Sequence, residues 1–552
     1  AKCFGCGCKG TNFRAFSEVI VQYMRTENTH MRLRDHAYSN FTEKLLARDI
    51  KPGQILSQRE LVELTGRSLG AIREMIPRLE ADGLIKTVPK RGLQVLSVDI
   101  ELVRNAVQSG TWRKSTGTFS NDINWGLLRG ASSPDQWGGG TTILEDFNYN
   151  LTGKGVDVVV HDSGLSINHP EFTDANGVSR VQQINWFTES GLPGTQSANH
   201  YRDYHGHGSH VAGTMAGRTQ GWARDARIYA LKVNGLEGSG DSGTGISVTS
   251  CFDVVKLWHR NKPIDPATGF KRPTVVNMSW GYGGSRTSTT LTSGTYRGTP
   301  WTNATPGFTN NTAQWGSAGI IPAVGINRYI NVRVGSVDAD LQELIDEGVH
   351  VCIAAGNSFY YIAADGDQDW DNSANFGSGQ EFYHRGSSPY STGAFIVGNM
   401  DITYQGGLEH KSESSCTGPG VDIYAPGTSI MSPASTDKSG GCDLTDGTQS
   451  SATTVNSALN ASYKLMKISG TSMASPNVAG MAATILEANP GMLPAQMKTY
   501  LHNNATQGLL YDGVTDNWDD QDSVQGGPNR IFKTPFTNPV PITMNNITIN
   551  KI

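Results

Sequence analysis

The chain contains 552 residues, of which 37% are hydrophobic and 17% are charged. The charged fraction is too low for a disordered chain, the 65 glycines follow no three-residue collagen period, and no apolar run approaches the ~20 residues of a membrane helix. The net charge of −5 is unevenly divided, because residues 1–110 carry 17 Lys and Arg against 12 Asp and Glu. We therefore expect a loop-rich globular protein without a membrane span, with a basic and an acidic module that have different partners.

Residues 1–30 show no periodic pattern and receive no structural assignment. They contain no cationic segment followed by an apolar core, so no secretory signal is visible in the sequence. The expected location is therefore the cytoplasm, with association with a virus particle as the alternative.

Residues 31–100 are predicted to form three helices followed by two strands. Ser57 and Glu60 have the spacing of a capping box, which predicts that a helix begins between them. Residues 89–92 read Pro-Lys-Arg-Gly and predict the turn of a hairpin. The expected elements are helices over Asp35–Ala47, Gln58–Thr65 and Leu69–Asp82, and strands over Leu84–Val88 and Leu93–Val98.

This order is that of a winged helix-turn-helix. The stretch IKPGQILSQRELVELTGRSLGAIREMIPRLEADGLIKTVPKRGLQV closely resembles the GntR family of bacterial transcription regulators, and the resemblance covers residues 34–98. It implies DNA contacts from the first helix of the motif, the recognition helix and the wing, through side chains directed at phosphates. The matching positions are Arg59, Arg73, Lys90 and Arg91.

Two residues depart from the family pattern. Leu69 stands where the family commonly has a DNA-contacting Arg, and Pro77 falls inside the recognition helix, where it removes a backbone donor. The effector domain that usually follows in GntR regulators is absent from the sequence. Because winged helices also dock proteins, a protein-docking module is the alternative to DNA binding.

The sequence changes character after this module. Residues 101–120 are mostly polar and are interpreted as a linker. Short apolar strands then alternate with glycine-rich turns and helical patterns, which favours an α/β domain with a parallel sheet over residues 121–505. Residues 506–552 are interpreted as a C-terminal tail. Three long polar stretches within the domain are interpreted as loops suited to binding: Gly283–Asn311, Ser358–Ser388 and Ser432–Tyr463.

Three segments of the α/β domain carry side chains suited to nucleophilic catalysis. The apolar run Val156–Val160 predicts a buried strand that delivers Asp162 at its carboxyl end. A helical pattern begins near His207, and Ser472 precedes the helix predicted over Asn477–Asn489, where the helix dipole favours negative charge. Taken singly, each has a plainer interpretation: a turn aspartate, an N-cap serine or, for the three histidines in HGHGSH, a metal cluster.

Taken together, the motifs DSG, HGSHVAGT and GTSMASP resemble those of the subtilisin-like serine peptidases, the subtilases. The segments NWGL, VVNMSWG, AAGN and APG match further family motifs, so the resemblance spans roughly residues 118–505. It implies a three-layer α/β/α fold with a mainly parallel sheet. It also implies a triad in which Ser472 attacks a peptide carbonyl, His207 transfers the proton and Asp162 orients the imidazole.

The same resemblance assigns roles around the triad. Asn357 in AAGN is expected to bind the oxyanion together with the N–H of Ser472. Ser279, Trp280 and Gly281 are expected to pair with an extended substrate as an added strand. Trp280 replaces a commonly smaller apolar residue, which changes the shape of the substrate pocket.

An inserted segment contains alternating carboxylates whose oxygens could hold calcium. They are Asp365, Asp367, Asp369 and Asp371. Trp370 and Phe376 stand at the spacings of the glycine and glutamate of an EF-hand loop, so a solvated acidic loop is the alternative. Many subtilases bind calcium, and the resemblance therefore allows structural calcium elsewhere in the domain, whereas the triad requires no cofactor for its chemistry.

We therefore expect a serine endopeptidase that cleaves protein or peptide substrates through an acyl-enzyme, with an N-terminal module that binds DNA. Two alternatives remain open. One is a DNA-binding regulator whose peptidase-like body is inactive, against which the intact motifs and Asn357 argue. The other is a structural or virion-associated protein that retains a peptidase domain, which the insertions and the tail permit.

Overall fold

The computed structural model divides the chain into two units, residues 1–103 and 104–552, each with its own internal contacts. None of the described helices is both long enough and apolar enough to cross a membrane. The structure describes residues 37, 41, 50, 54–81, 85–89, 91–95, 107–113, 123–131, 142–149, 151–241, 243–287, 292–302, 319–320, 327–375, 379–438, 454–513 and 520–534.

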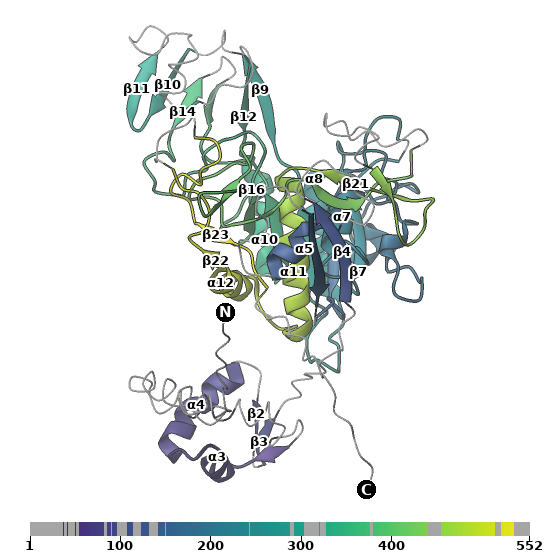
Figure 1. Ribbon diagram of the computed structural model, residues 1–552, viewed down its shortest axis with the longest axis vertical. Helices are drawn as coiled ribbons and strands as arrows, with labels where there is room; N and C mark the ends of the chain where they lie inside the picture. Colours follow the sequence, from purple (N-terminus) through teal and green to yellow (C-terminus); the bar gives the residue numbers. More distant parts are fainter. Residues whose placement is uncertain are drawn as a thin grey trace, which may run out of the picture. The chain divides into compact units, whose positions relative to one another are not determined.

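The N-terminal unit contains a winged helix (Figure 1). Its strands pair antiparallel in the order β1-β3-β2, so that β2 and β3 form the wing. The helix predicted over Asp35–Ala47 lies almost wholly outside the described residues, whereas the later predicted elements are confirmed. They are β1 (Ile55–Leu56), α3 (Gln58–Thr65), α4 (Leu69–Ala81), β2 (Ile85–Val88) and β3 (Gly92–Val95).

Local sequence signals set the ends of α3. Ser57 Oγ accepts the Glu60 N–H at 3.2 Å, and the Glu60 carboxylate accepts the Ser57 N–H at 2.7 Å, which completes the predicted capping box. The helix ends at Gly66, whose φ of 66° favours glycine. Pro77 lies on an exposed face of α4, and the helix continues past it to Ala81.

The second unit is built on a mainly parallel sheet of nine described strands. Its path runs β22-β23-β18-β16-β13-β8-β6-β7, and β17 pairs antiparallel with β16. The predicted α/β class is thereby confirmed. The strands are β6 (Asp157–Asp162), β7 (Arg227–Lys232), β8 (Thr274–Met278), β13 (His350–Ala354), β16 (Phe395–Gln405), β17 (Leu408–Lys411), β18 (Ile423–Pro426), β22 (Thr506–Gln507) and β23 (Arg530–Ile531).

Helices cover both faces of this sheet, which gives three layers. In the sheet, β7 lies on one side of β6, whereas β8 and then β13 lie on the other. The connection from β6 to β7 therefore runs one way across the sheet, and the connections from β7 to β8 and from β8 to β13 run the other way. Because parallel crossovers are right-handed, α7 lies on one face and α8 and α10 lie on the other. The helices are α5 (Trp125–Ala131), α6 (Trp186–Ser190), α7 (His207–Ala216), α8 (Val248–Asn261), α10 (Gly335–Asp346), α11 (Thr471–Ala488), α12 (Pro494–Asn504) and the 3₁₀ turn η3 (Pro170–Phe172).

Strand β6 shows why the sheet forms where the apolar run predicts it. All six of its residues are buried, because parallel strands are covered on both faces and need apolar side chains on each. Asp157, the first residue of β6, forms ion pairs with Lys262 at 2.6 Å and with Arg272 at 3.0 Å. The buried carboxylate is therefore neutralised, as burial of a charge requires.

The stretches predicted as long loops contain short strands, and in this respect the prediction was wrong. Strands β9 and β12 form an antiparallel ribbon, and β10, β11, β14 and β15 form a separate antiparallel sheet. These strands extend beyond one end of the central sheet (Figure 1). Their bounds are β9 (Gly283–Thr287), β10 (Ser293–Tyr296), β11 (Thr299–Thr302), β12 (Asn327–Asn331), β14 (Ser373–Asn375) and β15 (Gln380–Phe382). A further antiparallel sheet has the order β19-β21-β20 and is formed by β19 (Ile430–Pro433), β20 (Thr454–Asn456) and β21 (Lys464–Ile468).

Segments interpreted as linker and tail also contribute strands to the second unit. Strand β4 (Val107–Arg113), inside the predicted linker, pairs antiparallel with β5 (Thr142–Asn148). In the predicted tail, β23 pairs in parallel with β18. The buried Lys411 donates to the carbonyls of Ser412 and Ser415 at 2.9 Å and also to that of Gln521, which fastens the C-terminal segment to the domain.

Residues 104–552 expressed without the winged helix should fold, because each unit has its own internal contacts. A chain that starts at residue 114 should melt at a lower temperature, since it lacks the seven residues of β4 that pair with β5. Thermal unfolding followed by circular dichroism compares the two chains.

Equal melting temperatures would show that the β4 pairing contributes nothing. Aggregation of residues 104–552 that is relieved by adding residues 1–103 would make the winged helix a folding partner and overturn the separability of the units.

Candidate active site

Asp162 and His207 meet at the carboxyl end of β6. Asp162 is the last residue of β6, and His207 is the first residue of α7. His207 Nδ1 lies 2.8 Å from Asp162 Oδ1, and the Ser163 N–H donates to the same oxygen at 2.7 Å. The Asp162 side chain is 2% exposed, whereas that of His207 is 18% exposed. A carboxylate therefore fixes one ring nitrogen, and Nε2 remains to exchange protons.

These two groups alter each other's proton affinity. Burial favours the neutral form of Asp162, but the charge and hydrogen bond of His207 and the N–H of Ser163 outweigh it, so the pKa of Asp162 is lowered. Burial also favours neutral His207, but the carboxylate of Asp162 outweighs it, so the pKa of His207 is raised. A histidine in this state is a strengthened base, and it must be deprotonated to act as one.

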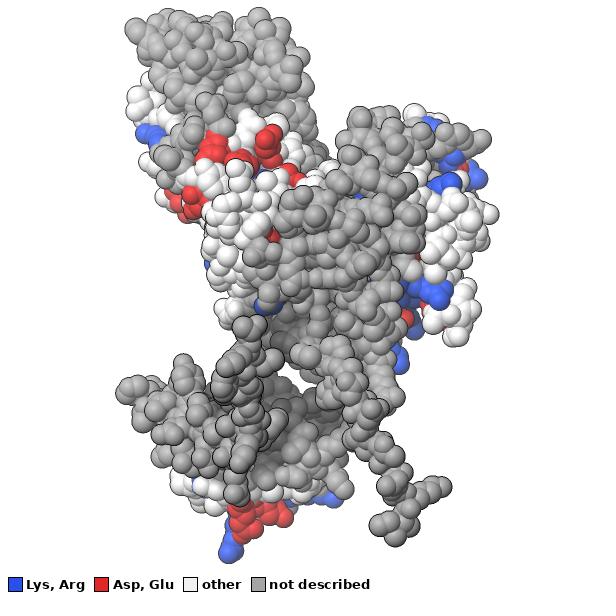
Figure 2. Space-filling model, viewed as in Figure 1, with Lys and Arg blue, Asp and Glu red and all other residues white. Residues whose placement is uncertain are grey.

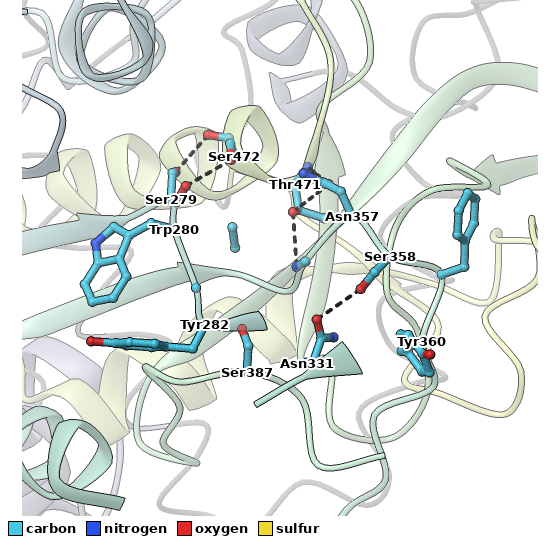
Figure 3. A pocket seen from close by; sticks show the side chains of 14 residues that line it. Ser279, Trp280, Tyr282, Asn331, Asn357, Ser358, Tyr360, Ser387, Thr471 and Ser472 are labelled. Atoms are coloured by element: carbon cyan, nitrogen blue, oxygen red, sulfur yellow. Dashed lines mark hydrogen bonds between the residues drawn. The ribbon is translucent and has the colours of Figure 1, made fainter. Parts of the chain in front are cut away.

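Ser472 lies in the first turn of α11, which begins at Thr471 rather than at the predicted Asn477. Pro476 has no N–H and cannot donate to the carbonyl four residues earlier, which is that of Ser472. This carbonyl instead accepts from Ser279 Oγ at 2.9 Å, while Ser472 Oγ donates to the Ser279 carbonyl at 3.1 Å. These two hydrogen bonds hold the start of α11 against Ser279, which follows β8 (Figure 3).

The amide of Asn357 is oriented by the helix that carries Ser472. Its Oδ1 accepts the Thr471 N–H at 2.8 Å and the Thr471 hydroxyl at 2.9 Å. A backbone N–H can only donate, so this end of the amide is the oxygen, and Nδ2 points away from Thr471. Figure 3 shows Asn357 and Ser472 on the same side of one cavity. The free donor and the hydroxyl therefore border a common space.

That cavity has a volume of about 430 Å³. It is lined by all three residues predicted to bind substrate, together with Asn357 and Ser472. None of the described residues that line it is charged. Trp280, Tyr282, Phe359 and Tyr360 make much of its wall aromatic. The lining consists of Ser279, Trp280, Gly281, Tyr282, Asn331, Ala354, Gly356, Asn357, Ser358, Phe359, Tyr360, Ser387, Thr471 and Ser472.

Trp280 is held in place by the strand that carries Asp162. Its indole Nε1 donates to the His161 carbonyl at 3.0 Å, and its ring lies 5.4 Å from the His161 ring and 5.9 Å from the Tyr282 ring. Gly281 follows, and a Cβ there would meet Ser387 Oγ at 2.4 Å. The large indole of Trp280 and the lack of a side chain at Gly281 together shape this wall of the cavity.

Several lining residues carry no sequence signal. Asn331 comes from β12, in the long segment between β8 and β13, where it accepts the Ser358 hydroxyl at 3.1 Å. Phe359 follows the AAGN motif with a φ of 63°, which is rare for a bulky residue. Its N–H donates to the Ser414 carbonyl at 3.1 Å, which holds this backbone in place. Neither residue could be assigned to the cavity before the long segment was placed.

The three histidines near α7 do not gather as a metal cluster. His210 is buried, and its Nε2 lies 3.0 and 3.1 Å from the carbonyls of Ile430 and Met466. The rings of His205 and His207 lie 5.9 Å apart in an edge arrangement. Within the part of the chain that the structure describes, no group of three His, Cys, Asp or Glu side chains is placed to hold a metal ion.

The alternating acidic residues of the insertion have separate partners. Asp369 is buried and accepts two hydrogen bonds from Arg297, at 2.8 and 3.0 Å. Asp371 accepts from Arg385 at 2.6 Å, Asp367 accepts the Ala364 N–H at 2.8 Å, and Asp365 is exposed. Two of these carboxylates thus bond to arginines that follow β10 and β15, and the four carboxylates are not brought together.

Three of the four predicted DNA contacts are exposed on the winged helix. Arg59 lies on α3, Arg73 on α4 and Arg91 in the turn just before the wing strand β3, while Lys90 lies outside the described residues. Arg73 Nε donates to Gln58 at 3.3 Å, which links the two helices. Figure 2 shows acidic side chains beside basic ones on the described surface of this unit.

Comparison with known proteins gives two family matches. Residues 33–95 match the model of the bacterial regulatory proteins of the gntR family, and residues 153–532 match the model of the subtilase family. The chain is 26% identical to an extracellular serine proteinase of Thermus sp. (strain Rt41A), over 71% of this chain and 62% of that protein. It is also 26% identical to an alkaline protease of Alkalihalobacillus alcalophilus, over 85% of this chain and 83% of that protein.

A crystal structure of a cold adapted subtilisin-like serine proteinase superposes with a TM-score of 0.43 and 23% identity, and the match covers 75% of this chain and 98% of the other. The chain spans less than two thirds of the length of the Thermus proteinase. The subtilase model, in contrast, matches more than half of this chain, over the sheet and helices that carry Asp162, His207, Asn357 and Ser472. The chain belongs to the subtilase family.

Proposed function

We propose that the second unit hydrolyses peptide bonds as a serine endopeptidase. The proposal rests on the His207–Asp162 hydrogen bond of 2.8 Å, formed at the same edge of the sheet as the cavity of Ser472 and Asn357. A base oriented by a carboxylate, a hydroxyl at a helix N-terminus and a free amide donor are the parts that acyl transfer needs. Membership of the subtilase family supports the same reaction class.

The reaction begins when the Ser472 hydroxyl turns from the Ser279 carbonyl toward His207. His207 Nε2 takes the hydroxyl proton as Oγ bonds to the peptide carbonyl carbon. Asn357 Nδ2 and the Ser472 N–H donate to the oxyanion. The C–N bond then breaks as His207 returns the proton to the amine, which leaves an acyl-enzyme. Water repeats the sequence, with His207 as its base, and releases the acid.

The substrate is a protein or peptide in an extended conformation. Main-chain groups of Ser279 and Gly281 pair with it as an added strand. The side chain that precedes the scissile bond enters the 430 Å³ cavity, where Trp280 forms part of the wall. None of the described lining residues is charged, so a charged side chain would lose its hydration there without gaining a partner.

Ser472→Ala should abolish both peptide hydrolysis and covalent labelling by a fluorophosphonate, because the attacking oxygen is gone. Ser469→Ala is the matched control, since Ser469 is exposed, lies three residues before Ser472 and accepts the Ser429 N–H at 2.9 Å. Gel fluorescence after labelling and casein cleavage measure the two properties. Wild-type labelling of Ser472→Ala would contradict the assignment of the nucleophile.

A wild-type chain that neither labels nor cleaves would overturn the proposed function and favour an inactive peptidase-like body. This outcome is separate from a wrong choice of nucleophile, because it appears before any substitution is made.

Asn357→Ala and Asn357→Asp should each lower kcat by about 10²–10³-fold with little change in KM, because both remove a donor that acts in the transition state. Only the alanine variant also removes the acceptor of the Thr471 N–H. We therefore expect a lower melting temperature for Asn357→Ala than for Asn357→Asp. A change confined to KM in both variants would count against the oxyanion role.

A second candidate function is DNA binding by the winged helix. We infer it from the gntR family match and from the exposure of Arg59, Arg73 and Arg91 on α3, α4 and the wing. Leu69, which begins the recognition helix, is 42% exposed and offers no hydrogen-bond donor to a base edge. Affinity from phosphate contacts with little base readout is salt-sensitive and weakly specific.

Arg73→Ala should weaken duplex binding similarly for all sequences and lower the salt slope by about one. Fluorescence anisotropy at two or more salt concentrations measures both quantities. Arg260→Ala, on the exposed surface of the second unit, is the matched control and should change neither. Absence of binding at low salt, or tight binding that is insensitive to salt, would refute DNA binding of this kind and favour protein docking.

A further inference from the structure

A buried carboxylate lies beside the proposed base without taking part in the reaction. Asp203 is four residues before His207, and its side chain has no exposed surface. Its Oδ1 accepts the Ser163 hydroxyl at 2.8 Å and the Gly206 N–H at 2.7 Å. Its Oδ2 accepts both the N–H and the hydroxyl of Ser209, at 2.7 and 2.6 Å. Four donors on one buried carboxylate indicate a site built to hold that charge.

The donors of these four hydrogen bonds are residues close in the chain to Asp162 and His207. Ser163 follows Asp162, Gly206 precedes His207, and Ser209 lies in the first turn of α7. The Ser163 hydroxyl in turn accepts the Gly208 N–H at 2.8 Å. Asp203 therefore joins the end of β6 to the beginning of α7.

Asp203 also replaces a cap that α7 lacks. The N-cap position is Gly206, with a φ of 93°, and glycine has no side chain to accept the free N–H groups of the first turn. The Ser209 N–H, which an N-cap side chain would accept, goes to Asp203 instead. A side chain at Gly208 would meet the Gly164 carbonyl at 2.2 Å, so the two segments approach too closely for bulkier residues.

The negative charge of Asp203 acts on His207. Burial lowers the pKa of His207, whereas Asp162 raises it. Asp203 raises it further, by a smaller amount than Asp162. Two further titratable side chains face this ring, His205 and His210, and burial lowers the pKa of both. Lys232 donates to the Arg202 carbonyl at 2.8 Å and pairs with Asp241. Burial lowers the pKa of Lys232, and the nearby charge of Asp203 opposes that shift.

We propose that Asp203 is a positioning residue for the proposed base, one that fixes the first turn of α7 against the end of β6. This inference rests on the proposed peptidase function. Asp203 does not contact the reacting atoms. It sets the geometry in which the His207 ring meets Asp162.

Glu171 provides a matched control within the same domain. It is equally buried, and it accepts the N–H groups of Thr219 at 2.7 Å and Gln220 at 3.3 Å as well as the Thr219 hydroxyl. These donors follow the far end of α7, which ends at Ala216. Glu171→Gln therefore removes a buried carboxylate of similar structural importance without touching the turn that carries His207.

The test compares Asp203→Asn with Glu171→Gln. Asparagine keeps the shape but can accept at only one of its two terminal atoms, so two of the four donors lose their partner. We expect kcat to fall by about 10–100-fold with little change in KM, the scale of effect that a small misplacement of a catalytic group produces. The acid limb of the kcat/KM profile should move to lower pH, since His207 loses a neighbouring negative charge. Glu171→Gln should lower the melting temperature and leave the profile unchanged.

A readout that needs no activity separates this inference from the peptidase proposal. The low-field proton of the His207–Asp162 hydrogen bond, assigned by its loss in Asp162→Asn, is followed by NMR against pH. It should titrate at lower pH in Asp203→Asn and as in the wild type in Glu171→Gln. If Asp203→Asn does not fold, Ser209→Ala should shift the same titration by a smaller amount, and Ser209→Thr, which keeps the hydroxyl, should restore it.

If Asp203→Asn showed the wild-type pH profile of kcat/KM and the wild-type NMR titration, the positioning role would be overturned. The same holds for Ser209→Ala if Asp203→Asn does not fold. Equal shifts in Glu171→Gln would also overturn the positioning role, because the effect would then be a general consequence of destabilising α7. A wild-type chain without hydrolytic activity but with the expected shifts in the NMR titration would refute the peptidase proposal and leave the role of Asp203 intact.

Discussion

The site depends on the parallel direction of the central strands. β6, β8 and β13 lie side by side and point the same way, so the segments after them meet at one edge. Asp162 ends β6, Ser279 follows β8, and Asn357 follows β13. Each side chain needs only its own short turn to reach the common space, and α11 then brings Ser472 against Ser279.

The residues at this edge could be predicted because their motifs combine chemistry with local structure. The apolar run before Asp162 identifies a buried strand, and the small residues after His207 identify a packed helix start. The capping box at Ser57 and Glu60 fixed a helix boundary in the same way. In each case, a local hydrogen-bond or burial pattern in the sequence indicates the element before its distant partners are known.

What could not be predicted depends on long-range packing. Strand β9 reads GGSRT and has no apolar alternation, so only its pairing with β12 reveals it. Asn331 reaches the cavity through that pairing. Asp203 resembles any loop aspartate in sequence, and its four donors come together only when β6 and α7 are in place. Pro476 looks like a helix boundary, although its missing N–H is what frees the Ser472 carbonyl for Ser279.

The bonds between Ser279 and Ser472 join residues 193 positions apart in the chain. Contacts of such sequence separation form late, because the intervening loop must close before they stabilise anything. During translation, β6 and α7 leave the ribosome long before α11, so the His207–Asp162 pair is made without its proposed nucleophile. Under the proposed function, a ribosome-bound chain therefore cannot cleave itself or its neighbours until synthesis has passed α11.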